Sequence, residues 1–581
     1  MSNGLILTGP AGGGPRPPAE FPPPPLTLLE ALLKALMSLF VGQPPLTAQA
    51  IDTQMQALRS EFRAAMEDAS ASMPTHSQQA FADRATAMIS DVLRNCMKRV
   101  KDEETGEASR NVKQSTFQKA AANARLLVHR HLQVAQAMER QKLGTPEIRK
   151  VWVENPGGPY LPKVERIVVL RAAPPIENLV LRGGGAKGIG NPPALRALEN
   201  LGKLSELKKV VGTSAGALTA VCLASGMSAA AFQQLSDKTN MRSLLSSPSN
   251  FAQRYPQVKL GWIGFGAGNA LETLDRASAG SVTDYLRAHW NEVVATPQWS
   301  RLGPADQARL LSLRDQDFEA SPRTGQMITF HDLHLMHQLA PARFKELVLT
   351  GYNIDQKQST YFSAASHPDM PVALAGRISM SIPIFFKPVR MEVNGQPQSF
   401  VDGGVGSNMP SEAILEGLHG RQMDEAMART LLMTYDEQGN AYSIMHGSPN
   451  ERKKASGGVL SRFTNERLDA EKIHFSGVNV LPVFHGKLGT FSFGASRESI
   501  EQAQVQSMLN ALDYIDTTMG QARHDLVTDV GAAARLLSAR ERRAFLKKHG
   551  KDDDPLNAAL CQEIRALSRP PATARAAAAA S

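Results

Sequence analysis

A serine with a glycine two residues away on each side, set between an apolar strand pattern and an apolar helix pattern, restricts the fold of this chain more than any other segment. The segment is Lys208-Lys-Val-Val-Gly-Thr-Ser-Ala-Gly216, and the apolar run Ala217–Ala224 follows it. This order of strand, tight turn and helix is typical of a nucleophile elbow. Gly212 and Gly216 suit it because such a turn brings neighbouring backbone close, and Ser214 is held in the open at the positive end of a helix. We interpret Ser214 as a nucleophile, with a structural Gly-Ser turn as the alternative.

A second apolar strand pattern, upstream of the elbow, runs into three consecutive glycines. The segment Ile176-Glu-Asn-Leu-Val-Leu-Arg-Gly-Gly-Gly-Ala-Lys-Gly188 places Gly183, Gly184 and Gly185 directly after the strand. Asn191 and Pro192 then suit the N-cap and first turn of a helix over 193–201. Backbone N–H groups at such a helix start can face a negative charge, either a phosphate or a reaction oxyanion, and the loop alone does not distinguish the two.

Neighbouring residues argue against both phosphate-binding alternatives. A dinucleotide site requires an acidic residue at the end of the second strand, where this chain has Gly212-Thr-Ser214. A P-loop requires Gly-Lys-Ser/Thr, whereas Lys187 is followed by Gly188. The loop therefore favours an oxyanion.

A carboxylate in a third glycine-containing turn is the candidate general base. Asp402 ends the short apolar run Phe400-Val-Asp402 and precedes Gly403 and Gly404. Taken alone this is an ordinary Asp-Gly turn, but beside an elbow serine the carboxylate can accept a proton. A Ser-His-Asp triad is disfavoured because no later histidine lies at the end of a strand pattern; these histidines are His419, His446, His474 and His485.

Composition narrows the class of protein further. The chain has 581 residues, enough for several domains, and its net charge of +9 is spread over the whole length, unlike the dense basic stripe of a nucleic-acid binder. Three distant cysteines, Cys96, Cys222 and Cys561, support neither a disulfide framework nor a zinc site. The longest apolar run, Leu26–Val41, is interrupted by charges and too short to span a bilayer, and no Sec signal precedes it. We expect a soluble protein that needs no metal.

Changes in composition along the chain predict five regions. Residues 1–25 form a disordered Gly/Pro-rich tail, and 26–150 are helical, beginning with an apolar stripe over Leu26–Phe40. From 151 to 511, short strand patterns alternate with helical ones, as in a parallel sheet covered by helices. The strand patterns are Ile167–Leu170, Asn178–Leu181, Lys209–Val211, Glu346–Leu349, Leu431–Met433 and Val478–Val483. A polar helical cap or insertion extends over about 228–341. Residues 512–567 are helical and include the basic stretch Arg535–Lys551, a candidate membrane contact, and 568–581 form a second disordered tail.

The three motifs GGGAKG, GTSAG and DGG, in this order, resemble the patatin-like phospholipase family. Within that family the chain is similar to the type III-secreted cytotoxins of the ExoU type. The likeness covers about Glu177–Ala511; the other similar segments are Leu223–Phe232, Leu235–Lys238, Ile328–Leu333, Ser366–Met370 and Arg377–Phe386.

The resemblance implies a three-layer α/β fold with a mixed central sheet flanked by helices. It also implies an acyl hydrolase in which Ser214 is the nucleophile, Asp402 its base, and the amides of Gly183–Gly185 the oxyanion hole. Its substrates would be membrane phospholipids, cleaved by phospholipase A and lysophospholipase activity. Export without a Sec signal, translocation into a host cytoplasm and a secretion chaperone at the N-terminal region follow from the same resemblance.

Activation by host ubiquitin is a weaker implication. Relatives of this type carry a long C-terminal helical region that attaches to membrane and supports that activation, whereas 70 residues follow position 511 here. Two other functions stay open: hydrolysis of neutral lipids or other esters in bacterial lipid turnover, and binding of a host protein with secondary or silent lipase activity. The sequence does not indicate the acyl position cleaved, the preferred head group or the oligomeric state.

Overall fold

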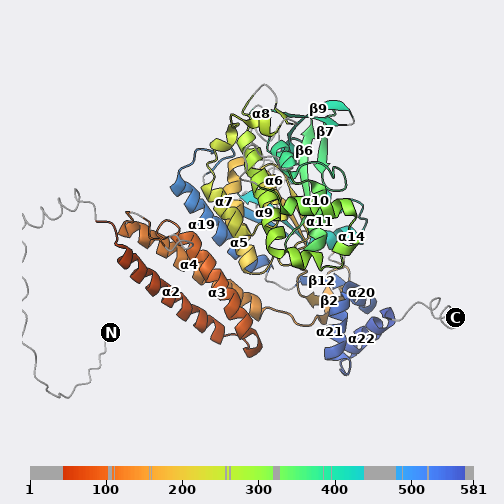
Figure 1. Ribbon diagram of the computed structural model, residues 1–581. Coiled ribbons are helices and arrows are strands. Elements are labelled where there is room, and N and C mark those ends of the chain that lie inside the picture. The colour runs from red at the N-terminus through yellow and green to blue at the C-terminus, as the bar shows by residue number, and fades with distance from the viewer. Residues whose placement is uncertain are drawn as a thin grey trace, which may run out of the picture.

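The structure is a computed structural model (Figure 1). It describes residues 44–101, 107–109, 111–155, 158, 160–255, 258–260, 264–317, 327–383, 385–393, 395–436, 479–486, 488–519 and 523–568. The predicted tail over 1–25, the predicted helix over Leu26–Phe40 and nearly all of the predicted C-terminal tail lie outside these residues. Within the described part of the chain, no helix combines the length and the apolar character that crossing a membrane requires.

Three long helices form the N-terminal unit, at the lower left of Figure 1: α2 (Ala48–Ala71), α3 (Thr75–Met97) and α4 (Gln114–Arg140). Apolar side chains spaced three or four residues apart give each helix a buried stripe, which in α2 includes Ile51, Met55 and Leu58. Ion pairs from Arg130 of α4 to Asp513, at 2.8 Å, and to Asp516, at 2.9 Å, fasten this unit to the neighbouring segment of the α/β domain.

A mixed sheet is the centre of the molecule. Its neighbouring strands, in spatial order, are β11 (Asn479–Phe484), β10 (Thr430–Asp436), β3 (Asn178–Leu181), β4 (Lys209–Gly212), β6 (Glu346–Asn353), β9 (Gln396–Asp402), β8 (Val389–Val393) and β5 (Lys259–Leu260), and β7 (Gln358–Phe362) also pairs with β6. The five strands from β11 to β6 are parallel, and β9, β8, β5 and β7 are antiparallel to their neighbours. This arrangement confirms the predicted mixed α/β fold.

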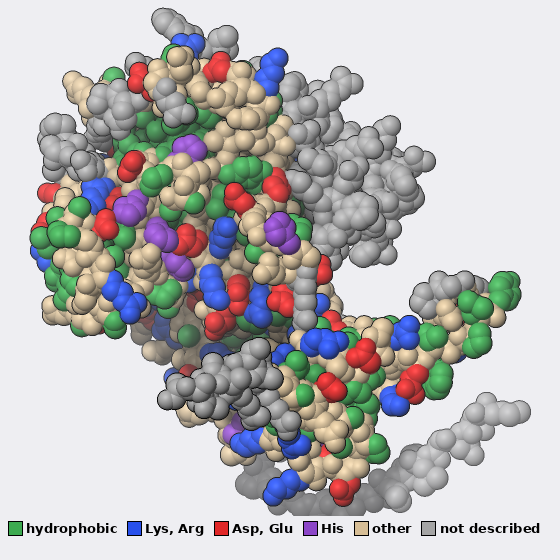
Figure 2. Space-filling model, turned by 90° about the vertical axis from the view of Figure 1, so that its right-hand side faces the viewer, with side chains coloured by type: hydrophobic (Ala, Val, Ile, Leu, Met, Phe, Trp, Pro, Cys, Tyr) green, Lys and Arg blue, Asp and Glu red, His purple; other side chains and the backbone are tan. Residues whose placement is uncertain are grey.

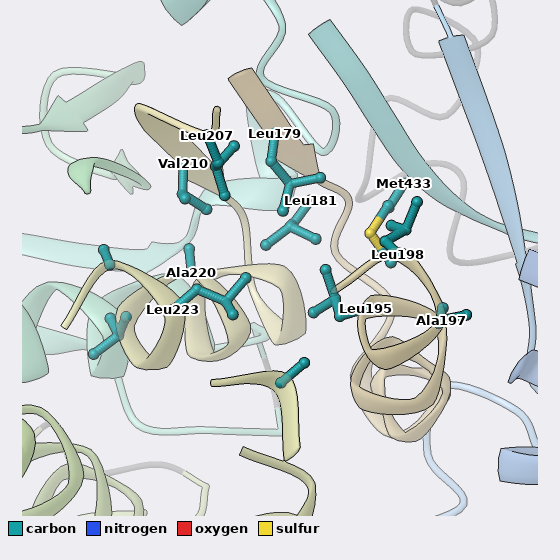
Figure 3. Close-up of a cluster of buried hydrophobic side chains, with 14 of the residues drawn as sticks. Leu179, Leu181, Leu195, Ala197, Leu198, Leu207, Val210, Ala220, Leu223 and Met433 are labelled. Carbon is teal, nitrogen blue, oxygen red and sulfur yellow. The ribbon is translucent and has the colours of Figure 1, made fainter. Parts of the chain in front are cut away.

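Helices cover both faces of the sheet. Helices of one face include α5 (Asn191–Asn200), α6 (Ala215–Ala224), α9 (Gly268–Val294), α12 (Val372–Ser379) and α19 (Arg497–Tyr514); α13 (Glu412–Leu415) and α14 (Arg421–Ala428) lie on the other. Because both faces are covered, successive strand residues are buried on opposite sides: Leu179 and Leu181 face α5 and α6, whereas Val180 belongs to the core beneath α13 (Figure 3). The strand ends between these layers carry the residues discussed below.

The predicted cap is largely built into the domain. It contains α7 (Ala229–Lys238), η2 (Ser243–Leu245), α8 (Phe251–Arg254), α9, η3 (Trp299–Arg301), α10 (Pro304–Arg314) and α11 (Phe330–Leu339). Helix α9 buries Leu271, Leu274 and Val282 in the main core, and it packs on α6 and α12. It is therefore part of the helical layer and not a separate cover.

A small second sheet crosses the domain boundary expected at 151, because it combines strands from about residue 150 with a strand near the C-terminus. Strands β1 (Glu147–Val153) and β2 (Val164–Arg171) pair antiparallel, and β2 also pairs with β12 (Arg523–Val527) near the C-terminus. Helices α20 (Val530–Leu536), α21 (Ala539–His549) and α22 (Pro555–Leu567) cover one face of this sheet. In β2, Ile167 and Val169 are buried while their neighbours are partly exposed, an alternation typical of a sheet with one covered face.

The surface carries both signs of charge close together. On the side that Figure 2 faces, Lys and Arg side chains are interleaved with Asp and Glu, and no large block of one charge is visible. Charges of both signs are thus mixed on this face.

Candidate active site

Ser214 occupies the turn between β4 and α6, at the carboxyl edge of the parallel strands. Its backbone has φ 54° and ψ −123°, a conformation that non-glycine residues seldom adopt and that the surrounding structure must enforce. A Cβ atom at Gly212 would lie 2.5 Å from the carbonyl oxygen of Gly216, and one at Gly216 would lie 2.2 Å from that of Leu181. Neither position has room for a side chain. The N–H of Ser214 donates to Ser379 Oγ at 2.9 Å, which fixes the strained turn.

Asp402 reaches the same edge of the sheet at the end of the antiparallel strand β9. It is paired with Gly351 of β6, and β6 is also the neighbour of β4, so two adjacent strand pairings bring Asp402 to Ser214. The N–H of Asp402 donates to the Ser381 carbonyl at 2.9 Å. The register of the sheet therefore sets the position of this carboxylate.

The carboxyl group of Asp402 is buried and incompletely bound. Oδ1 accepts a hydrogen bond from the N–H of Gly404 at 2.7 Å, whereas Oδ2 has no hydrogen-bond partner in the described part of the chain. Burial raises the pKa of Asp402 to about 7, and the Ser214 hydroxyl and the Gly404 amide oppose this rise. A carboxyl with this pKa is ionised in part at neutral pH and has an oxygen available for a proton.

The glycine loop packs directly against the serine. A Cβ at Gly183 would lie 2.9 Å from Ser214 Cβ, and one at Gly184 would lie 2.3 Å from Tyr435 Cε2. Gly185 has φ 59°, and a Cβ there would lie 2.3 Å from the Thr490 carbonyl oxygen. The glycines therefore allow a close approach that side chains would block.

The amides of this loop differ in what they bind. The N–H of Gly183 already donates to the Asn408 carbonyl at 3.2 Å. The N–H groups of Gly184 and Gly185 donate to no acceptor among the described residues. Ala215 begins α6, and the N–H of a first helical residue has no acceptor within its own helix. Among the described residues, the amides of Gly184, Gly185 and Ala215 thus have no acceptor.

Several residues that support the site were not singled out from the sequence as site residues. Tyr435 lies two residues past Met433, which pairs with Leu181, and its ring lies against Gly184. Its hydroxyl accepts a hydrogen bond from Asn191 Nδ2 at 3.0 Å, and burial raises its pKa to about 12. Asn191 was expected to be an N-cap; instead it is the first residue of α5, and its amide also binds Thr219 Oγ1 at 3.1 Å.

Two sequence signals could have identified part of this support. Tyr435 directly follows a predicted parallel strand, and Asn408 lies six residues after Asp402. The contribution of Ser379 and Thr490 has no local signal, because their contacts join segments far apart in the chain.

The remaining predicted residues are placed as follows. A Cβ at Gly188 would lie 3.0 Å from Ala215 Cβ, so this glycine lets the loop pass the start of α6. A Cβ at Gly403 would lie 2.0 Å from Thr350 Oγ1. Of the later histidines, His446 and His474 lie outside the described residues, and His485 packs edge-on against Tyr435. Among the described residues, no group of three His, Cys, Asp or Glu side chains is arranged to hold a metal ion.

An apolar pocket of about 120 Å³ adjoins the unbound amides. Gly185 and Ala215 line it together with apolar residues that include Ile189, Leu218 and Leu274. The arrangement places a hydrocarbon-sized space beside the groups that can face an oxyanion.

Comparison with known proteins finds a similarity over part of the α/β domain. Residues 179–415 match the family model described as patatin-like phospholipase. The chain is 30% identical over 238 residues to the uncharacterized protein YqhO of Bacillus subtilis (strain 168), an alignment that covers 40% of this chain and 64% of YqhO. The match confirms the family-level resemblance and the patatin-like fold.

Similar solved structures share low sequence identity with this chain. The type III effector protein ExoU is 20% identical, with 73% of this chain and 66% of that chain covered and a TM-score of 0.42. VipD from Legionella pneumophila is 18% identical, with 72% and 78% covered and a TM-score of 0.43. Full-length ExoU in complex with full-length SpcU, from the type III secretion system of Pseudomonas aeruginosa, is 22% identical, with 72% and 67% covered and a TM-score of 0.43. The chain thus spans slightly less than two thirds of YqhO and of the first ExoU chain.

Proposed function

Because residues 179–415 form a patatin-like phospholipase domain, a carboxylic ester hydrolase domain, we propose that this protein hydrolyses acyl esters of membrane phospholipids through Ser214 and Asp402. One observation carries the proposal: beside a strained elbow serine lies a buried carboxyl whose pKa is about 7 and whose Oδ2 lacks a partner among the described residues. An unassisted serine hydroxyl is a poor nucleophile at neutral pH and requires such a base.

The first half of the reaction transfers the acyl group to the protein. Asp402 Oδ2 takes the proton of Ser214 Oγ as that oxygen bonds to the ester carbonyl carbon. The resulting oxyanion accepts hydrogen bonds from the three unbound amides, those of Gly184, Gly185 and Ala215. When the tetrahedral intermediate collapses, the ester C–O bond breaks and Asp402 returns its proton to the departing alcohol oxygen. The products are an acyl-Ser214 ester and the lysolipid or other alcohol.

The second half restores the serine. Asp402 accepts a proton from water as that water attacks the acyl carbonyl, the same amides bind the oxyanion, and Ser214 leaves with the proton held by Asp402. Each oxyanion donor typically contributes on the order of 3 kcal/mol to lowering the barrier. We assign this role to Gly184 and Gly185 in preference to Gly183, whose amide is already bound by Asn408.

The pocket beside these amides supports an acyl substrate. Gly185 and Ala215, two of the candidate oxyanion donors, line it beside apolar residues, so the acyl chain of an ester bound at these amides has an apolar space next to it. The reaction itself requires no metal. For the wider biology we propose, from the sequence resemblance alone, a translocated toxin that acts at host membranes, with ubiquitin as its candidate activator.

Fatty-acid release from phosphatidylcholine vesicles and from a triacylglycerol emulsion tests the reaction and the lipid class together. The wild type, Ser214→Ala and the control Ser205→Ala would be compared, each with and without eukaryotic lysate or purified ubiquitin. Ser205 is a suitable control because it is an exposed serine in the turn after α5. We expect the wild type and Ser205→Ala to release fatty acid from vesicles and Ser214→Ala to be at least about 10³-fold slower.

Three other outcomes would change the proposal. Equal hydrolysis by Ser214→Ala removes the assigned nucleophile. A preference for the emulsion favours the neutral-lipid alternative. Activity that is independent of lysate and ubiquitin removes the activation by a host protein but leaves the enzyme.

A further inference from the structure

Four phenylalanine rings form an aromatic patch on the surface of the α/β domain. Phe265, Phe385, Phe491 and Phe493 come from three separate segments, and ring centroids lie 5.2 Å apart for Phe265–Phe385 and Phe385–Phe491 and 5.6 Å apart for Phe385–Phe493. Phe265 is 47% exposed and Phe491 is 44% exposed. These two are the most exposed phenylalanines of the described chain, and both belong to this one patch.

The chain segments that carry the rings also hydrogen-bond to both halves of the candidate active site. Phe491 follows Thr490, whose carbonyl accepts the N–H of Ala186 at 2.9 Å, next to the glycine loop. Phe385 follows Ser381 by four residues, and the Ser381 carbonyl holds the N–H of Asp402. One end of the patch is thus tied to the oxyanion donors and the other to the base.

The apolar interior continues from the aromatic patch to the acyl pocket. Phe385 packs on a small core that contains Ala270, Leu218 and Leu244. The same three residues line the pocket beside Gly185 and Ala215. The core next to the aromatic patch and the wall of the pocket therefore share apolar side chains.

A buried arginine holds the aromatic patch in its exposed form. Arg377 is fully buried, and its guanidinium donates to the Gly266 carbonyl at 2.8 Å, to the Lys387 carbonyl at 3.2 Å and to Ser381 Oγ. The two segments that it joins carry Phe265 and Phe385, whose backbones are also linked by the N–H of Phe265 and the Phe385 carbonyl at 2.8 Å. The rings are accordingly displayed by a rigid frame.

Two cations lie beside the rings. Arg242 is exposed and approaches the segment after Phe493 so closely that a Cβ at Gly494 would lie 2.4 Å from its Nη2. The N–H of Lys387 donates to the Phe265 carbonyl at 2.9 Å, which places this partly exposed lysine next to Phe265 in the chain fold. Aromatic rings with adjacent cationic groups match the boundary between acyl chains and lipid phosphates.

We propose that the aromatic patch is the surface through which this protein enters a phospholipid bilayer, with the rings among the acyl chains and Arg242 and Lys387 at the phosphates. The inference rests on the proposed function, because a membrane-binding surface is useful to this protein if the ester cleaved at Ser214 belongs to a membrane lipid. A second copy of the chain could also cover an apolar patch, but the flanking cations and the continuity with the acyl pocket favour lipid.

The test separates membrane entry from chemistry. The double variant Phe265→Ser/Phe491→Ser, the wild type and the control Leu311→Ser would be compared; Leu311 is a 41% exposed apolar residue on α10. Sedimentation with phosphatidylcholine vesicles, with and without 20% phosphatidylserine, measures binding, and hydrolysis of a monomeric short-chain ester measures the site. We expect the double variant to bind vesicles at least about tenfold more weakly and to hydrolyse the soluble ester as the wild type does. Leu311→Ser is expected to match the wild type in both assays.

A gain-of-signal variant keeps the proposal testable if the double variant misfolds. Phe491→Trp should add a blue-shifted fluorescence component when vesicles are mixed in, and none without lipid. Vesicle binding by the double variant at the wild-type level, or loss of soluble-ester hydrolysis by a folded double variant, would overturn the proposal. Concentration-dependent dimers that disappear in the double variant, with vesicle binding unchanged, would assign the patch to a second copy.

Failure of the proposed function gives a different result. In that case the wild type hydrolyses neither ester, while the blue shift of Phe491→Trp and the weaker vesicle binding of the double variant persist.

Discussion

Two buried aspartates in this domain differ in how completely their carboxyl oxygens are hydrogen-bonded. Asp332, on α11 in the region expected to be a cap, is 2% exposed, and Asp402, at the end of β9, is 4% exposed. Both oxygens of Asp332 are bound: Arg309 donates to them at 2.9 and 2.7 Å, and the N–H of Thr329 donates to Oδ2 at 2.8 Å. Asp402 has one bond to a backbone amide, and its other oxygen lacks a partner among the described residues.

The difference shows how equal burial serves structure in one region and chemistry in the other. A fully bound carboxylate with a paired guanidinium fixes the start of α11. A carboxyl that is desolvated and half bound holds its proton near neutral pH and costs stability when it ionises. Both residues lie in segments that resemble the family, so the resemblance alone does not separate these roles.

The largest expected effect is the loss of catalysis in Asp402→Asn. The amide keeps the shape of the side chain and the bond from Gly404 but cannot accept the serine proton, so we expect kcat/KM to fall by about 10³-fold or more. The melting temperature should stay the same or rise, because a costly buried charge is removed. Kinetics on vesicles with parallel calorimetry measures both. Retention of activity, or a large loss of stability, would show that Asp402 is a structural residue like Asp332.

Asp332→Asn should show the opposite pattern. Removing one partner of a buried ion pair leaves the Arg309 guanidinium uncompensated, which typically costs about 3–5 kcal/mol of stability. Once folded, the variant should hydrolyse lipid at close to the wild-type rate. Denaturant unfolding compared with Asp306→Asn, which breaks the more exposed contact with His331, provides the control. A stable variant with little activity would contradict the comparison.

The pH dependence is the most specific test. Because the pKa of Asp402 is raised to about 7, kcat/KM should rise about tenfold per pH unit below that value and level off above it. The stability of the fold changes in the opposite direction. Because the pKa of Asp402 is higher in the folded state than its unfolded value of 3.8, the contribution of Asp402 to the free energy of unfolding is fully present below pH 3.8 and is lost as pH rises through about 7. The free energy of unfolding of Asp402→Asn, relative to that of the wild type, should therefore increase between about pH 4 and pH 7, by on the order of 4 kcal/mol. A flat stability difference between pH 4 and pH 8 would show that Asp402 is not desolvated.

Much of the fold was predictable because its signals are local. The apolar runs at 178–181, 209–211, 346–349 and 431–433 are strands of the parallel part of the sheet, as predicted. The run at 167–170 was assigned to the same α/β region, but it is part of β2, the central strand of the small second sheet. In the sequence this run is continuously apolar, like the strands of the parallel sheet, so no local pattern distinguishes it from them. Its partner β12 lies more than 350 residues later, and nothing local identifies that partner.

The sequence by itself determined the strained serine turn, the glycine loop and the carboxylate at a strand end, because each depends on steric demands within a few neighbouring residues. Only the tertiary structure decided which of these groups meet and in what chemical state. Strand register brings Asp402 to Ser214, the Asn408 carbonyl occupies the Gly183 amide, and packing from all sides raises the pKa of the carboxyl. The desolvation of Asp402 and the contacts that hold Ser214 come from residues far apart in the chain, such as Ser214 and Ser379, which are 165 positions apart. No local sequence pattern therefore contains them.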